Sequence, residues 1–312
     1  MSMSEVVLDV RNMSVALGPH LAVKEISYQI HAGEILGVVG ESGCGKSLTS
    51  LAVMGLLDKK LALSGEILFA GENLVGMTEK RYQRIRGEGI GMIFQEPMTA
   101  LNPVVTVGEQ VAEMFLVHEN TSKAEAMNCA IEMLRQVHIP YPERRAKAFP
   151  HELSGGMRQR VMIAMALACK PKVLIADEPT TALDVTVQAQ VLDLLEELRE
   201  TTGTAIQFIS HSLGVVSQIS DRVMVMYAGQ VVEIADVNDI FDNPQHPYTQ
   251  ALLDTIPRVG VDIKRLPAIP GSVPPLEQRG ENYTFRDRCP ELFDHYVQRA
   301  KQRNGQIVGG YS

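Results

Sequence analysis

The stretch Gly40-Glu-Ser-Gly-Cys-Gly-Lys46-Ser47 decides the fold of this chain. It matches the pattern GxxxxGK[ST], in which small residues let consecutive backbone N–H groups close around a phosphate at a helix N-terminus. Lys46 is placed to neutralise phosphate charge, and the Ser47 hydroxyl suits Mg²⁺, which prefers oxygen ligands. The apolar run 34–39 predicts a strand before the loop, and the spacing from Lys46 to Leu57 predicts a helix after it. This context favours a phosphate loop over a chance glycine-rich turn.

Two further apolar runs end in polar residues, as the first one does. Residues 172–176 lead into Asp177-Glu178-Pro179, and residues 204–209 lead into Ser210-His211. Buried strands of this kind are typical of parallel sheets, and open parallel sheets bind ligands beyond the carboxyl ends of their strands. We therefore expect an α/β fold of the P-loop NTPase class, with a mostly parallel sheet and its site at this edge.

The pair Asp177-Glu178 offers two carboxylates at one strand end. Because side chains alternate along a strand, the two carboxylates point in different directions and can serve different roles. Asp177 is the candidate for the Mg²⁺ shell, and Glu178 is the candidate general base that polarises the attacking water. The alternative is a solvated acidic turn before Pro179. The position downstream of a phosphate loop favours the catalytic interpretation.

The segment Leu153-Ser154-Gly155-Gly156-Met157 comes before a predicted helix. Ser154 is expected to cap that helix and to leave N–H groups at its N-terminus for an anion. Capping alone explains an isolated Ser-Gly-Gly. Beside the other motifs, the segment is more plausible as a second phosphate-binding element.

The rest of the chain divides by pattern. Residues 100–170 are mostly helical in spacing, and Thr186 to Glu200 predicts an amphipathic helix that ends at Gly203. Prolines accumulate after about residue 236, so regular structure should thin out into a tail.

The motifs together resemble those of ABC-transporter ATPases, which carry Walker A, Q-loop, signature, Walker B, D-loop and switch histidine in this order. The resemblance covers roughly residues 34–212. It implies that Gln95, in Phe94-Gln-Glu-Pro97, contacts the metal and the water and senses the permease. It also implies that Asp184 crosses a dimer interface and that His211 reaches the γ-phosphate.

The resemblance also implies a domain organisation and a full set of site residues. Residues 1–99 and 171–235 would form the ATP-binding core with an N-terminal antiparallel β subdomain, residues 100–170 an inserted helical signature subdomain, and residues 236–312 a C-terminal extension. Nucleotide binding is assigned to Gly40, Glu41, Ser42, Gly43, Cys44, Gly45, Lys46, Ser47 and Leu48. Catalysis is assigned to Glu178, His211, Gln95 and Lys46, and Mg²⁺ binding to Ser47, Gln95 and Asp177. Ser154, Gly155, Gly156 and Met157 would act in trans, on ATP held by a second ATPase subunit.

The tail narrows the resemblance to one branch of the family. The segment from Asn243 to Leu253, with its His246-Pro-Tyr248-Thr, is similar to the C-terminal extension of oligopeptide, dipeptide and nickel importer ATPases. From the residues alone, it predicts only a turn that enters a helix. Many members of this branch hold an iron–sulfur cluster on four cysteines. Here only Cys289 of that pattern is present, so no cluster is expected. The usual adenine-stacking aromatic is also missing, so base stacking should be weak or should come from His20.

Composition argues against several function classes. A net charge of −8 disfavours nucleic acid as the main partner, because phosphate backbones are bound by clustered cations. The four cysteines are widely separated, as is usual in a reducing cytosol, and no apolar run is long enough to span a membrane. No secretion signal is evident at the N-terminus.

The resemblance implies a peripheral subunit on the cytoplasmic face of a bacterial membrane. Its partners would be a second ATPase subunit, two permeases and, indirectly, an extracytoplasmic solute-binding protein. The alternative is a non-transport ABC ATPase of DNA repair or translation, although such proteins typically carry a long coiled coil or two cassettes. A P-loop GTPase or kinase is more remote, since these proteins lack the Ser154 element.

Overall fold

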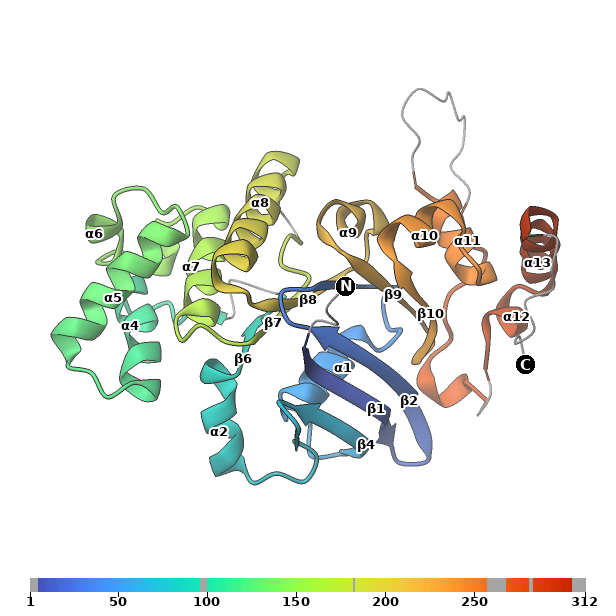
Figure 1. Cartoon of the computed structure of the whole chain (residues 1–312), viewed down its shortest axis with the longest axis horizontal. Helices are drawn as coiled ribbons and strands as arrows, with labels where there is room; N and C mark the ends of the chain where they lie inside the picture. Colours follow the sequence, from blue (N-terminus) through green and yellow to red (C-terminus); the bar gives the residue numbers. More distant parts are fainter. Residues whose placement is uncertain (1–4, 96–99, 182, 257–267, 281–282, 305–312) are drawn as a thin grey trace.

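A six-stranded sheet forms the centre of the molecule in the computed structural model (Figure 1). The structure describes residues 5–95, 100–181, 183–256, 268–280 and 283–304, with side chains described as far as residue 299. The strand order is β10-β9-β3-β8-β7-β6, and all neighbours are parallel except β10, which pairs antiparallel with β9. The mostly parallel sheet expected from the sequence is thereby confirmed. The strands are β3 (Ile35–Val39), β6 (Ile90–Ile93), β7 (Val173–Asp177), β8 (Ala205–Ser210), β9 (Arg222–Tyr227) and β10 (Gln230–Asp236).

A second, antiparallel sheet is built from the N-terminal part of the chain, as the resemblance implied. Its strand order is β2-β1-β4-β5. Apolar side chains of β1 and β2 pack with those of the central strands and of the helix after the phosphate loop into one buried cluster. The strands are β1 (Val6–Leu17), β2 (His20–His31), β4 (Leu61–Phe69) and β5 (Glu72–Asn73).

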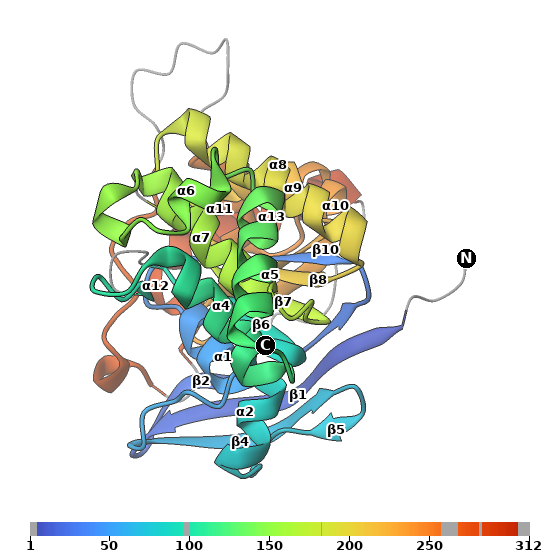
Figure 2. The ribbon, with the colours of Figure 1, turned by 90° about the vertical axis from the view of Figure 1, so that its left-hand side faces the viewer.

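Helices cover the central sheet and extend beyond one end of it as a lobe. The lobe stands in front in the view of Figure 2, with the antiparallel sheet below it. Two of its helices start with capping boxes, Thr106 with Glu109 and Ser122 with Glu125, which satisfy backbone N–H groups of the first turn. The lobe consists of α4 (Val107–His118), α5 (Lys123–Gln136), α6 (Pro142–Arg145), the 3₁₀ turn η1 (Pro150–Glu152) and α7 (Gly155–Leu167).

The remaining helices of the core pack on the sheets. The amphipathic helix expected from Thr186 to Glu200 is α8, and it ends at Gly203, whose φ of 70° is the left-handed conformation of a helix C-cap. Helix α1 is shorter than the sequence predicted, because the chain turns at Gly55, where φ is 61°. These helices are α1 (Lys46–Val53), α2 (Glu79–Glu88), α8 (Val185–Thr202), α9 (Leu213–Ile219) and α10 (Val237–Asp242).

The C-terminal extension is more regular than its prolines suggested, so the expectation of a thinning tail was wrong for its described part. Tyr248, Phe285 and Tyr296 are buried and belong to the same hydrophobic cluster as the sheet. Proline limits the backbone, but it does not prevent neighbouring aromatic residues from packing. The extension contains α11 (Pro247–Asp254), the 3₁₀ turn η2 (Leu276–Gln278), α12 (Phe285–Arg288) and α13 (Pro290–Asn304).

Candidate nucleotide-hydrolysis site

The phosphate loop lies between β3 and α1, as the sequence predicted. Its conformation requires glycine at two positions: Gly45 has φ 102°, and a Cβ on Gly40 would stand 2.2 Å from the backbone oxygen of Met226. The Lys46 side chain is buried, and its ammonium group donates to the carbonyl oxygens of Gly40 at 2.7 Å and Glu41 at 3.2 Å. The loop therefore folds around the Lys46 charge, where an anion would be attracted.

Asp177 ends strand β7 next to this loop. Its side chain is buried and accepts a hydrogen bond from Ser47, but its Oδ1 has no hydrogen-bond partner within the described part of the chain. Burial raises the pKa of Asp177 above its usual range, although the Ser47 hydroxyl and the Lys46 charge act in the opposite direction. A buried carboxylate oxygen without a partner needs an explanation, and a bound cation is one.

The Glu178 carboxylate is contacted by three side chains, which follow three different strands. Its Oε2 accepts from the Gln95 amide at 3.1 Å and from the Thr181 hydroxyl at 2.9 Å, and it lies 3.3 Å from Nδ1 of His211. The residue itself has φ 48°, a backbone conformation that is uncommon outside glycine and is often found at functional sites. The structure thus brings three predicted residues together across β6, β7 and β8.

Thr181 was missed by the sequence reasoning. It lies three residues after Glu178 in Glu178-Pro-Thr-Thr181, and its hydroxyl points back to the carboxylate. Threonine is common in turns for other reasons, so the only available signal was this short spacing.

Ser154 caps α7, as the sequence predicted. Its hydroxyl accepts from the backbone N–H of Met157 at 3.3 Å, and the residue is exposed at the start of the helix. Gly155 and Gly156 form the first turn, which leaves their N–H groups at the surface of the lobe. The cap is an observed structural role, and the action in trans stays a prediction.

Asp184 also has an observed capping role. Its carboxylate accepts from the backbone N–H of Val187 at 2.9 Å and starts α8. The residue is exposed, so its carboxylate faces the solvent side of the molecule. Contact with a second subunit stays a prediction for this residue.

His20 lines a cavity of about 190 Å³ beside the phosphate loop. The C-terminal extension contributes Arg279 and Tyr283 to the same cavity, and Arg279 also donates to the carbonyl oxygen of Gly43 at 3.2 Å. Tyr283 is distant from His20 in the sequence, so the local pattern around His20 does not indicate it. Base stacking on His20 stays a prediction, and Tyr283 is a second aromatic at this place.

The cysteines show no shared site among the described residues. All four are free, and no group of three or more His, Cys, Asp or Glu side chains in the described part is arranged to hold a metal. Cys289 is buried with its Sγ 3.5 Å from the carbonyl oxygen of Pro270. The absence of an iron–sulfur cluster stays a prediction.

Cys44 is fully buried inside the phosphate loop, and burial raises the pKa of its thiol. The effect of burial outweighs that of the nearby Lys46 charge, so Cys44 is not an activated thiolate.

We expect complete alkylation of Cys44 to abolish ATP binding, because added bulk has no room beside Gly40. The measurement is ATP binding after labelling verified by mass spectrometry. Cys44→Ser protein, treated in the same way, should keep its affinity, and normal binding by fully labelled wild-type protein would refute the expectation.

This arrangement defines a P-loop ATPase: a phosphate loop, a buried aspartate beside it, and a glutamate held by a glutamine and a histidine. The family model described as "ABC transporter" matches residues 23–181, and the model described as "Oligopeptide/dipeptide transporter, C-terminal region" matches residues 232–295. The chain belongs to the ABC transporter family.

Curated relatives match along most of the chain. The oligopeptide transport ATP-binding protein AppD of Bacillus subtilis is 51% identical over 278 residues, covering 88% of this chain and 85% of that protein. The oligopeptide transport ATP-binding protein OppD of Escherichia coli is 46% identical over 295 residues, covering 93% and 88%.

Solved structures of ABC cassettes share the fold. One is a dimeric ATP-binding cassette in a post-hydrolysis state with ADP and phosphate; it is 30% identical, has a TM-score of 0.65, and covers 74% of this chain and 98% of its own. Another is CbiO1 of Clostridium perfringens, part of an ABC transporter complex, with 29% identity, a TM-score of 0.67 and coverage of 76% and 91%.

Proposed function

We propose that this chain is the ATP-hydrolysing subunit of a bacterial importer that takes up short peptides or a related solute. The observation that carries the hydrolytic role is the convergence of Gln95, Thr181 and His211 on one oxygen of Glu178. The match of residues 232–295 to the oligopeptide/dipeptide transporter region, together with the names of the relatives, supports the substrate class. The same findings give no support to a role in DNA repair or translation.

Glu178 is the proposed general base. A carboxylate can take a proton from water as the water attacks the γ-phosphate, and its hydrogen bonds fix the direction in which it does so. His211 lies beside it, and the N–H of its imidazole can donate either to the glutamate or, when ATP is bound, to a γ-phosphate oxygen. Lys46 draws the β- and γ-phosphates into the loop.

Mg²⁺ fits the residues next to the loop. The unpartnered oxygen of Asp177, the hydroxyl of Ser47 and the amide oxygen of Gln95 are the oxygen ligands that this ion prefers. The bound ion would neutralise phosphate charge as it develops. Gln95 donates from its amide nitrogen to Glu178, which leaves the amide oxygen for the metal.

Two copies of the cassette are proposed to share each ATP. The N-terminus of α7, with Ser154 and Gly156, presents N–H groups at the surface of the lobe and would bind the γ-phosphate of ATP held by a second ATPase subunit. Loss of that phosphate removes a ligand common to both subunits and lets them separate. Asp184 would lie at the same interface. The second subunit is either a copy of this chain or a similar ATPase.

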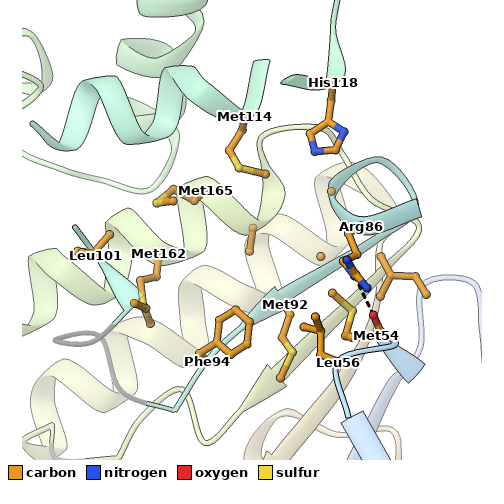
Figure 3. Close-up of a pocket in the computed structure, with 15 residues that line it drawn as sticks. Met54, Leu56, Arg86, Met92, Phe94, Leu101, Met114, His118, Met162 and Met165 are labelled. Carbon is orange, nitrogen blue, oxygen red and sulfur yellow. Dashed lines mark hydrogen bonds between the residues drawn. The ribbon is translucent and has the colours of Figure 1, made fainter. Parts of the chain in front are cut away.

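A methionine-rich pocket supports docking of a permease segment (Figure 3). It has a volume of about 260 Å³ and lies where the end of β6 meets α4 and α7. Met92, Met114, Met162 and Met165 point into it, and Phe94 closes one side. Methionine adapts to irregular apolar partners, and an open apolar surface of this kind is typical of a protein-binding site.

The pocket and the hydrolysis site include adjacent residues of the chain, Phe94 and Gln95. Phe94 lines the pocket and Gln95 donates to Glu178, so an apolar segment that moves Phe94 also moves the glutamine. This continuity is a physical path by which a permease and ATP hydrolysis are coupled. The subunit would therefore sit at the cytoplasmic face of the membrane. No described helix is long and apolar enough to cross it.

Met114→Glu tests the docking surface. A buried charge in the pocket should abolish co-purification with the permeases and the stimulation of ATP hydrolysis by them, while leaving the ATPase activity of the isolated subunit within about twofold. Leu116→Glu is the matched control, because this exposed apolar residue lies on the same helix but outside the pocket. Unchanged recovery of permeases by Met114→Glu protein would contradict the docking site.

The proposed function is tested by purifying the chain from solubilised membranes. Recovery of two permeases and a second ATPase subunit is expected. After reconstitution into vesicles with the solute-binding protein, ATP should drive uptake of a short peptide. Recovery with ribosomes or DNA alone, or vesicles that take up no peptide in an ATP-dependent way, would overturn the proposal.

A further inference from the structure

The C-terminal extension contacts the phosphate loop directly at Glu41. Arg288 of α12 makes a two-pronged ion pair with the Glu41 carboxylate, with Nη1 2.6 Å from Oε2 and Nη2 3.2 Å from Oε1. Tyr248 of α11 bonds the same residue twice. Its hydroxyl accepts from the backbone N–H of Glu41 at 3.1 Å and donates to Oε2 at 3.3 Å.

Arg288 and Tyr248 are both held in place by further contacts. The Arg288 side chain is only 3% exposed, and it also donates to the carbonyl oxygens of Pro270 and Gly271 at 2.9 and 3.0 Å. The Tyr248 ring is fully buried, 4.6 Å from the ring of Tyr227 and 5.3 Å from that of Phe285. The Glu41 side chain is 31% exposed, so the pair is partly buried, and its bidentate geometry distinguishes it from the fully exposed ion pairs that contribute little.

The contacts act on the part of the loop that holds Lys46. The carbonyl oxygen of Glu41 accepts from the Lys46 ammonium and from the backbone N–H of Cys44 at 3.2 Å. Gly40 precedes Glu41 and has φ 153°. Because glycine has no Cβ, this position allows the loop many backbone conformations when no other contact holds it. Fixing both the N–H and the carboxylate of Glu41 removes alternatives before the phosphates bind, and preorganised sites bind more tightly.

We propose that Arg288 and Tyr248 are positioning residues of the nucleotide site, and that the C-terminal extension sets the affinity for ATP by holding the phosphate loop through Glu41. The proposal rests on the proposed ATPase function. It gives the extension a role at the nucleotide, in addition to any role in transport. The competing explanation is that the same contacts only attach the extension to the core.

The test compares variants of the full chain for binding of a non-hydrolysable ATP analogue with Mg²⁺, measured by calorimetry. Arg288→Gln and Tyr248→Phe should each weaken binding by about tenfold, and should raise the KM for ATP while changing kcat by less than about twofold. Arg288→Lys should recover part of the affinity, because an ammonium group keeps the charge but not the two-pronged geometry. The double variant Glu41→Gln, Arg288→Gln should be no weaker than the worse single variant.

Tyr296→Phe is the matched control. It removes a hydrogen bond to Asp254 within the extension at 2.7 Å but touches no residue of the loop. It should lower the thermal midpoint and keep the affinity for the analogue. The proposal is overturned if Arg288→Gln binds the analogue as wild type does, or if Tyr296→Phe loses as much affinity. A wild-type protein that fails to bind the analogue would refute the proposed function itself.

Discussion

Replacing Glu178 with glutamine should lower the rate of ATP hydrolysis by about 100-fold or more while leaving ATP binding intact. Glutamine has the same shape, and its amide oxygen can still accept from Gln95 and Thr181, so the local structure is preserved. It cannot take a proton from water. The measurements are steady-state phosphate release and equilibrium binding of ATP.

The matched control is Glu197→Gln on α8, an exposed glutamate whose ion-pair partner is His138 at 3.6 Å. This variant should hydrolyse ATP at the wild-type rate. If Glu178→Gln keeps more than about a tenth of the wild-type turnover, the base lies elsewhere, and His211, which contacts the same oxygen, becomes the first candidate.

The central site was predictable because its signals are local. The phosphate loop depends on glycines and a lysine within eight residues, and the structure places them between a strand and a helix as expected. Asp177 and His211 follow apolar runs, and parallel strands bring their carboxyl ends to one edge. Periodicity and turn chemistry were sufficient for these elements.

The extension was not predictable in the same way, because its function depends on contacts between distant residues. The segment around Tyr248 was interpreted as a turn that enters a helix, and α11 does begin there after His246. Nothing in that local pattern indicates a bond to Glu41, which lies 207 residues earlier. The many prolines favoured an irregular tail, whereas the buried aromatic rings determine how it packs.

Asp177→Asn should abolish most Mg²⁺-dependent turnover and at the same time stabilise the protein without nucleotide. The variant removes a metal ligand next to Ser47, and since a metal contributes several kcal/mol to a charged transition state, we expect a loss of about 100-fold or more. It also removes a buried negative charge with an unpartnered oxygen. Thermal unfolding without nucleotide should then show a higher midpoint than wild type.

The pH dependence follows from the direction of the pKa shift. Because burial raises the pKa of Asp177 in the folded state, the folded protein binds this proton more readily than the unfolded chain. The carboxylate therefore lowers the free energy of unfolding at pH values above the folded pKa, and the penalty disappears as the pH falls toward about 4, near the ordinary value for aspartate. The stability gained in Asp177→Asn should be largest near neutral pH and should shrink on acidification.

Asp193→Asn, an exposed change on α8, is the control and should alter neither midpoint nor turnover. A lower midpoint for Asp177→Asn would show that the carboxylate has a stabilising partner in the free protein. Turnover above about a tenth of wild type would remove Asp177 from the metal shell. A higher thermal midpoint together with a loss of turnover in Asp177→Asn would instead show that the Asp177 charge lowers the stability of the free protein and is needed when Mg²⁺ and ATP bind.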